Sequence, residues 1–181
     1  MIEKINIARI IKDHINTLKD YETGKYYPWD FILFFIVPIT ISIILIICDI
    51  IIDKDMANAL VTSLSIFAAL LFNLLLLIYD ITRKEVNRDE ARNSKVKTDL
   101  LKQIFCNVSF SILISVFAIS ILLIIFLNIS INISILDRTL AVTDTQVNRF
   151  LSIFIYFLIT SFILTLFMVL KRVHVLLKGE F

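Results

Sequence analysis

Residues 104–127 read IFCNVSFSILISVFAISILLIIFL and carry no charge over their whole length. A helix that crosses a bilayer needs roughly 20 predominantly apolar residues, so this stretch predicts a membrane span. Residues 31–52, 56–81 and 150–170 meet the same requirement. Of the 181 residues, 59% are hydrophobic, whereas soluble domains contain about 45–50%. The sequence therefore predicts an all-α integral membrane protein, a four-helix bundle whose spans lie at these four places.

The distribution of basic residues predicts the orientation in the membrane. Of the 18 Lys and Arg residues, all but Lys54, Arg138 and Arg149 lie before the first span, between the second and third, or after the fourth. Cytoplasmic loops carry the excess of Lys and Arg. We therefore expect both termini and residues 82–103 to be cytoplasmic, and residues 128–149 to be external. Because the Ile-, Asn- and Lys-rich usage is typical of bacteria, the expected location is a bacterial inner membrane.

Residues 1–29 are expected to form a cytoplasmic part ahead of the four-span domain at residues 30–181. Within residues 1–20, apolar side chains fall on one side of a helix and charged side chains on the other. We expect this amphipathic helix to lie along the cytoplasmic membrane surface, with docking of the same face on a partner protein as the alternative. His14 falls near the edge of the apolar side, where packing is expected. An aromatic anchor at the interface follows, formed by Tyr26, Tyr27 and Trp29.

Three residues of the first span carry structural expectations. Pro38 lacks a backbone N–H, so we expect a kink there. Asp49 lies near the outer boundary, where it can be hydrated; we expect a structural or interfacial role, with a pore role as the alternative. Cys48 and Cys106 lie near opposite faces of a core about 30 Å thick, so no disulfide is expected to join them.

Hydrogen-bonding and small side chains recur along one face of the second span. Their steps of three, four or seven residues confine them to a stripe roughly 80° wide at about 100° per residue. The stripe consists of Asn58, Thr62, Ser65, Ala69, Asn73 and Asp80. Lipid tails offer no hydrogen-bond partner, so the stripe must face protein or water. Close helix packing and a water-lined path are both open.

The third span carries a similar face, formed by Asn107, Ser111, Ser115 and Ala118. We expect this face to pair with the stripe of the second span. The seven polar residues of the two faces that are candidates for pore lining or helix interfaces are Asn58, Thr62, Ser65, Asn73, Asn107, Ser111 and Ser115.

The apolar run of the third span continues to residue 136. As one helix, residues 104–136 would extend about 50 Å, which exceeds a hydrocarbon core of about 30 Å. The last part, LNISINISIL at residues 127–136, alternates apolar and polar residues as a strand does. We expect it outside the membrane as an extended or hairpin-like segment, with a helical extension as the alternative.

The connection between the second and third spans is rich in basic residues. These residues are expected to attract anionic lipid, at about 1 kcal/mol each, or to contact a cytosolic protein partner. Direct binding of nucleic acid is not expected, because neither interleaved aromatic residues nor a known motif accompanies the charges. The candidate contact residues are Arg83, Lys84, Arg88, Arg92, Lys95 and Lys97.

The sequence offers no recognisable catalytic motif. It contains no Gly-rich phosphate loop, no paired His at metal-binding spacing and no Ser/His/Asp set. We therefore expect no enzyme activity, no cofactor and no metal. The two glycines both lie outside the spans, which disfavours the broken helices of secondary transporters.

Two stretches resemble a group of small bacterial four-span proteins associated with anti-phage systems, including the membrane subunits of Kiwa-type systems. These stretches are TLKDYETGKYYPWDFILFFIVPI at residues 17–39 and SLSIFAALLFNLLLLIYD at residues 63–80. The resemblance covers about a quarter of the chain and is one of pattern. It implies an oligomeric inner-membrane component that works with a cytosolic sensor or effector and changes membrane permeability.

The leading expectation is thus a homo-oligomer that assembles through the polar faces of the second and third spans and responds to a cytosolic partner. A passive anchor or scaffold that recruits a soluble effector is the second expectation. A holin-like pore former is the third, and the length of the basic cytoplasmic loop disfavours it.

Overall fold

The computed structural model describes residues 6–18, 29, 32–86, 92–127, 134–135, 138–139 and 144–178. The described part is almost entirely helical. Its elements in chain order are α1 (Ile7–Asn16), the π-helix η1 (Ile32–Ile36), α3 (Val37–Ile47), α4 (Lys54–Val86), α5 (Arg92–Leu127), β1 (Ser134–Ile135), β2 (Arg138–Thr139) and α6 (Asp144–Lys178).

Three of the helices, α4, α5 and α6, are long and apolar enough to cross a membrane. The stretch Ile32–Ile47 forms a shorter apolar helix. These findings agree with the prediction of an all-α, multi-pass membrane protein. The short strands β1 and β2 pair in antiparallel fashion. Most of the alternating stretch at 127–136 lies outside the described residues.

The first apolar segment is divided by Pro38. The π-helix η1 comes directly before α3, and Pro38 occupies the first turn of α3. Proline cannot donate the backbone hydrogen bond of a regular turn, and single π turns are a common way to accommodate such an irregularity. The predicted kink therefore takes the form of a change in helix type.

α3 stops at Ile47, five residues before the end of the predicted first span at residues 31–52. The backbone N–H of Asp49 donates to Ile46 O and that of Ile50 donates to Leu45 O, both at 3.0 Å. This pair of bonds is a Schellman motif, in which the residue after the cap is left-handed and is usually glycine. Asp49 takes that place with φ 59°, which short polar side chains tolerate. Its carboxylate forms an ion pair with Arg149 of α6, so it has a structural contact within the chain.

The short connection from α3 to α4 is fixed at both ends. The backbone N–H of buried Ile52 donates to Ser152 Oγ of α6 at 3.1 Å. Asp53 then caps α4, because its carboxylate accepts from the backbone N–H of Met56 at 2.8 Å. These contacts bring the start of α4 against the first turns of α6.

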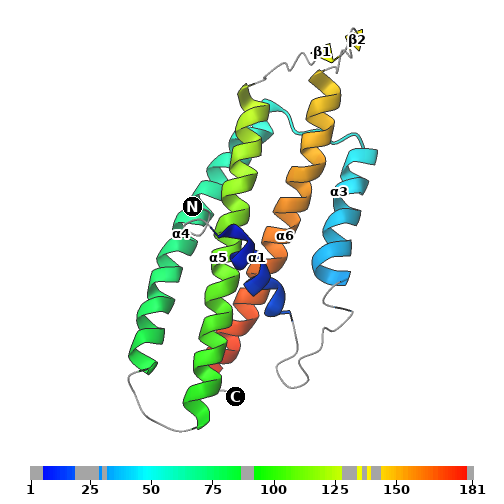
Figure 1. Ribbon diagram of the computed structural model, residues 1–181. Coiled ribbons are helices and arrows are strands. Elements are labelled where there is room, and N and C mark those ends of the chain that lie inside the picture. The colour runs from blue at the N-terminus through cyan, green and yellow to red at the C-terminus, as the bar shows by residue number, and fades with distance from the viewer. Residues whose placement is uncertain are drawn as a thin grey trace.

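The helices lie side by side in the order α4, α5, α6, α3 (Figure 1). Among the described residues α3 packs on α6 and reaches neither α4 nor α5. An edge-on ring contact at 5.9 Å between Phe67 and Phe162 joins α4 to α6, and α4, α5 and α6 share one apolar core. The arrangement is therefore more open than the predicted four-helix bundle, with α3 attached to one side of a three-helix core.

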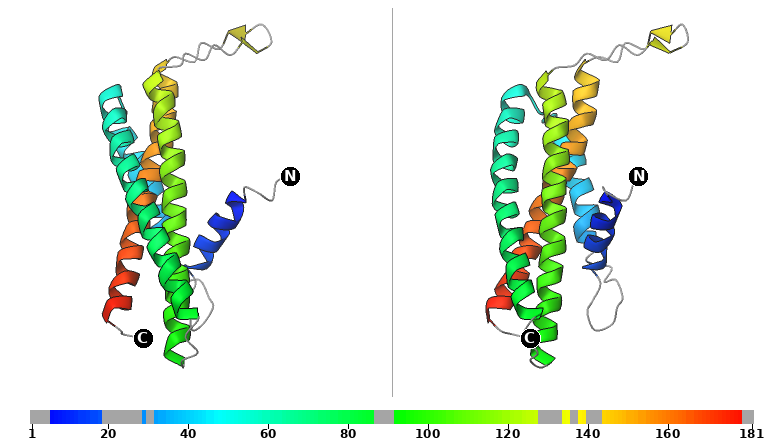
Figure 2. Two further views of the ribbon diagram at one scale, coloured as in Figure 1. Left: turned by 90° about the vertical axis from the view of Figure 1, so that its left-hand side faces the viewer. Right: turned by 60° about the vertical axis from the view of Figure 1, so that its left-hand side comes forward.

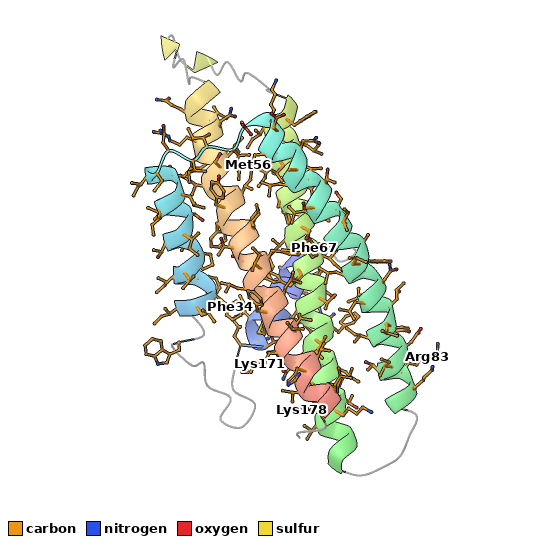
Figure 3. All side chains as sticks on the ribbon, turned by 180° about the vertical axis from the view of Figure 1, so that it is seen from behind. Phe34, Met56, Phe67, Arg83, Lys171 and Lys178 are labelled. Atoms are coloured by element: carbon orange, nitrogen blue, oxygen red, sulfur yellow. The ribbon has the colours of Figure 1, made fainter. Side chains whose placement is uncertain are left out.

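The basic residues mark one end of the molecule. Arg83, Lys171 and Lys178 lie toward one end of the helices, and Met56 lies toward the other (Figure 3). The last turn of α4, the first turn of α5 and the last turn of α6 share this basic end. The helices thus alternate in direction, as the predicted topology requires.

A heptad pattern explains the packing of the core. Along α5 one line of buried positions alternates at steps of three and four: Leu101, Ile104, Val108, Ser111, Ser115, Ala118, Leu122 and Ile125. Asn107 and Ile114 are buried beside this line. On α4 the most buried positions recur at steps of seven: Ala57, Leu64, Leu71 and Ile78. Apolar residues at this spacing pack helices at shallow left-handed angles, and small residues in the middle let the backbones approach closely.

Enlarging a central small residue of α5 should destabilise the core. Ser115 is fully buried, and we expect Ser115→Leu to lower stability by about 1–3 kcal/mol through overpacking. Ser120→Leu is a matched control, because Ser120 is exposed on the same helix and makes the same bond to the carbonyl four residues earlier. The measurement is the Tm of the detergent-solubilised protein. Equal Tm values for the two variants would contradict this packing.

Candidate functional site

A buried polar cluster joins α1 to the basic end of the helix core. It consists of His14 and Thr17 from the end of α1, Asn107 from α5 and Arg172 from α6. His14, Thr17 and Asn107 are all buried, at 4%, 8% and 0% exposure. We call this cluster the α1 latch, because it contains the side-chain hydrogen bonds that hold α1 to the core.

Asn107 is the centre of the α1 latch. Its Oδ1 lies 2.9 Å from His14 Nδ1 and accepts from Thr17 Oγ1 at 2.8 Å. The His14 ring also stacks on Phe110, with centroids 3.7 Å apart and planes 11° from parallel. An amide oxygen only accepts, so in this orientation Asn107 suits an imidazole that carries a proton on Nδ1. One asparagine thus contacts both polar side chains at the end of α1.

Arg172 completes the α1 latch at the end of α1. Its Nη2 donates to the backbone oxygen of Thr17, the C-cap residue, at 2.6 Å. The last carbonyls of a helix lack intrahelical partners and carry partial negative charge. The guanidinium therefore supplies both a donor and a favourable charge, and it connects the last turns of α6 to the position of α1.

The surroundings favour neutral His14. Burial lowers the pKa of His14 from 6.5 to about 4, the hydrogen bond with Asn107 raises it by less, and the Arg172 charge lowers it. Within the described residues, Asp13 on α1 is the nearest acidic group on the same helix and pairs with Arg9 at 3.9 Å. The docked position of α1 therefore favours a neutral imidazole.

The core next to the α1 latch contains further polar atoms. Asn107 Nδ2, Ser111 Oγ and Ser161 Oγ are buried and have no hydrogen-bond partner among the described residues. Such groups are rare, because each forfeits its solvation without a replacement bond. The region next to the α1 latch therefore contains buried polar atoms whose hydrogen bonds are not supplied by the described residues.

The structure separates the two predicted polar faces. Asn107, Ser111 and Ser115 are buried inside the chain, whereas Asn58, Thr62, Ser65 and Asn73 are exposed. The stripe of α4 lies roughly 130° around the helix from the buried heptad positions, at about 100° per residue. The prediction that the two faces pair with each other within the chain is therefore wrong, because α4 turns its apolar face to α5.

The basic candidates are only partly described. Arg83 and Lys84 are exposed in the last turns of α4, and Lys97 is half-buried on α5. Arg88 lies outside the described residues, as do the side chains of Arg92 and Lys95. Lys102, also on α5, lies 3.6 Å from Asp99. Arg83 and Lys84 are thus the basic candidates that the structure presents on the surface.

The α1 latch could be only half predicted. His14 packs as expected, and Asn107 was a candidate from its place on the polar face of the third span. Nothing in the spacing of either residue indicated that they meet across 93 positions of sequence. α1 contacts α5, and the N-terminal end of α1 leans away from that helix (Figure 2). Any placement of α1 along the membrane surface must be compatible with this contact.

Comparison with known proteins gives no further guidance, since no family model, curated protein or solved structure matches the chain. Among the described residues, no group of three or more His, Cys, Asp and Glu side chains could hold a metal ion. Cys48 and Cys106 are free, as the sequence predicts.

Removing the central amide should release α1. Asn107→Leu leaves His14 Nδ1 without its partner, which costs about 1–3 kcal/mol in a buried setting, whereas Thr17 Oγ1 keeps its hydrogen bond to the backbone oxygen of His14 at 2.7 Å. The distance between nitroxides at Arg9→Cys and Lys102→Cys, in a background lacking Cys48 and Cys106, should broaden and lengthen. Asn73→Leu makes the same chemical change at an exposed position and should leave the distance unchanged. An unaltered distribution in Asn107→Leu would show that the α1 latch does not hold α1.

Acidification should weaken the same contact. Because the docked state binds a proton only near pH 4 and a released His14 binds one near pH 6.5, docking should weaken by up to about 1.4 kcal/mol per pH unit between these values. Above pH 6.5 the effect should vanish. The nitroxide distance measured from pH 8 to about pH 4 tests this expectation. His14→Phe keeps the stacking on Phe110 without the titrating group, so its distance should respond much less to pH.

Proposed function

We propose that the protein is an oligomeric subunit of the bacterial inner membrane, with four crossings and both termini in the cytoplasm. In this proposal it acts with a cytosolic protein partner in phage defence and alters membrane permeability. The resemblance to anti-phage membrane subunits supports the biological setting. The fourth crossing would be η1 with α3, whose length of about 24 Å is short of a 30 Å core by an amount that local thinning accommodates.

The observation that carries the proposal is the exposed stripe of α4. Within the described part of the chain, the side-chain amides of Asn58 and Asn73 make no hydrogen bond, whereas Thr62 donates to the carbonyl of Asn58 at 2.9 Å. Asn73 lies about 10 Å along the helix from Asp80, inside the hydrocarbon. An amide moved from water into hydrocarbon costs about 4–8 kcal/mol without a partner. A second copy of the chain, or water enclosed by several copies, would remove that cost.

The apolar residues around the stripe limit where a partner can sit. Large side chains that suit lipid contact flank it, namely Ile66, Leu70, Phe72 and Leu77, and Leu76 lies within it between Asn73 and Asp80. The polar surface is thus a narrow band along one helix. Copies in one membrane share one orientation, so a closed assembly would bring this band of each copy toward a common axis parallel to the membrane normal.

The basic end supports contact with a cytosolic partner. Arg83 and Lys84 of α4 and Lys171 and Lys178 of α6 are exposed there, and three of them are visible in Figure 3. An acidic surface of a soluble protein would compete with anionic lipid for these charges. The α1 latch lies at the same end, so a partner that binds there could also move α1.

A passive anchor is the second candidate, and the burial of Asn107, Ser111 and Ser115 favours it. These residues are enclosed by their own chain, so of the two predicted polar faces the α4 stripe alone is left to line a path between copies. A two-fold contact through α4 would cover the stripe and conduct nothing. The two candidates differ in whether water reaches the stripe.

Cysteine chemistry at the stripe tests oligomerisation and water access together. In a background lacking Cys48 and Cys106, we expect Ser65→Cys to form disulfide-linked dimers in native membranes, because copies meet along α4. Phe167→Cys on the exposed side of α6 is the control and should not cross-link. Monomers only, for both variants, would refute assembly through the stripe.

A membrane-impermeant thiol reagent then separates the candidates. A water-lined assembly should expose Ser65→Cys to the reagent, and Asn73→Leu should abolish ion flux in proteoliposomes while cross-linking at residue 65 persists. A passive anchor leaves Ser65→Cys protected and shows no flux with or without the substitution.

A further inference from the structure

A cavity of about 240 Å³ lies beneath α1, where η1, α5 and α6 meet. Ile11, His14 and Ile15 form its α1 wall. Phenylalanines make up much of the remaining lining: Phe34, Phe35, Phe110, Phe117 and Phe157. Phe34 lies between the basic-side end of α3 and α6 (Figure 3). Rings from three different elements thus surround one space.

Ser161 places a hydroxyl at the wall of this apolar cavity. The residue lines the cavity and is only 7% exposed, and its Oγ has no hydrogen-bond partner among the described residues. The Oγ is covered by neighbouring atoms, so a turn about the Cα–Cβ bond is needed to present it to a ligand. Neighbouring Thr165 satisfies its own hydroxyl on the Ser161 carbonyl at 2.8 Å. An unsatisfied hydroxyl at the wall of a cavity is suited to a ligand oxygen, because a hydrogen bond there replaces lost solvation.

Size and depth define the class of ligand. An apolar cavity of about 150 Å³ takes benzene, and drug-sized ligands occupy about 300–1,000 Å³, so this cavity suits one substituted or fused ring. Ser161 lies about 16 Å along α6 from Arg172, too deep for a phospholipid headgroup. A charged ligand would be costly at that depth, so the ligand must be neutral.

We propose that this cavity binds a neutral, flat-ringed molecule of the quinone class, whose ring packs among the phenylalanines and whose carbonyl accepts a hydrogen bond from Ser161 Oγ. Quinones dissolve in the bilayer and combine a planar ring with carbonyl oxygens. Offset and edge-on packing against aromatic rings favours a planar ligand over a flexible acyl chain.

The ligand would also stabilise the docked position of α1. Because α1 forms one wall, occupancy of the cavity requires α1 to be in place, and a ligand stabilises the state that binds it. Release of α1 by Asn107→Leu should therefore weaken ligand binding, although Asn107 does not line the cavity.

Binding of 2-methyl-1,4-naphthoquinone to the full chain in nanodiscs tests the proposal. We expect saturable binding, detected by equilibrium dialysis, that Ser161→Ala weakens about 3- to 10-fold through loss of one hydrogen bond. Ser120→Ala removes an exposed hydroxyl elsewhere and should leave the affinity unchanged. The quinone should also narrow the nitroxide distance between residues 9 and 102.

A comparison on the unaltered protein covers the case in which Ser161→Ala fails to fold. There, 2-methylnaphthalene, which lacks the carbonyls, should bind several-fold more weakly than the quinone. Equal affinity for the two compounds, absence of saturable quinone binding, or a retained phospholipid that the quinone does not displace would each overturn the proposal. The last result would assign the cavity to an acyl chain.

Discussion

Hydrocarbon offers no hydrogen-bond partner, and this constraint decides where each polar side chain of the molecule can lie. On α5, serines occupy heptad positions where the chain encloses them, and Ser115 satisfies itself on the carbonyl of Ser111. On α4, the apolar heptad positions face the core instead, and the polar stripe is left outside. The same residue types therefore differ in their surroundings on neighbouring helices. On α5 they are packed within the chain, whereas on α4 the Asn58 and Asn73 amides have no hydrogen-bond partner in the described part of the chain. In our proposal another copy or enclosed water supplies that partner.

The α1 latch applies the same constraint to the amphipathic helix. Ile11 and Ile15 of α1 meet apolar walls of α5 and α6, and the polar atoms of His14 and Thr17 are satisfied by Asn107. The contact depends on a neutral imidazole and on a guanidinium from the last turns of α6. It therefore connects the basic end, a cavity in the core and the position of α1, which are the parts through which a cytosolic signal or a small ligand could act.

The sequence was sufficient for the features that follow from length and composition. Helices of 31 residues or more at α4, α5 and α6 are of this kind. The helix face that each polar stripe contacts could not be predicted. An 80° stripe shows that a helix has a polar and an apolar side, but it does not show which side packs against the neighbouring helix. The heptad of α5 carried that information, since Leu101, Ile104 and Val108 continue the line of Ser111 and Ser115. The contact of His14 with Asn107 depends on where α1 lies relative to α5. The hydrophobic periodicity within α1 does not predict that position.

The central claim is that the stripe of α4 is covered in the membrane. A cryo-electron microscopy map of the full chain in lipid nanodiscs measures this directly. The account predicts density of a second chain, or ordered water enclosed between chains, within hydrogen-bonding distance of the Asn58 and Asn73 amides. A monomeric particle with these amides turned toward acyl chains would contradict it.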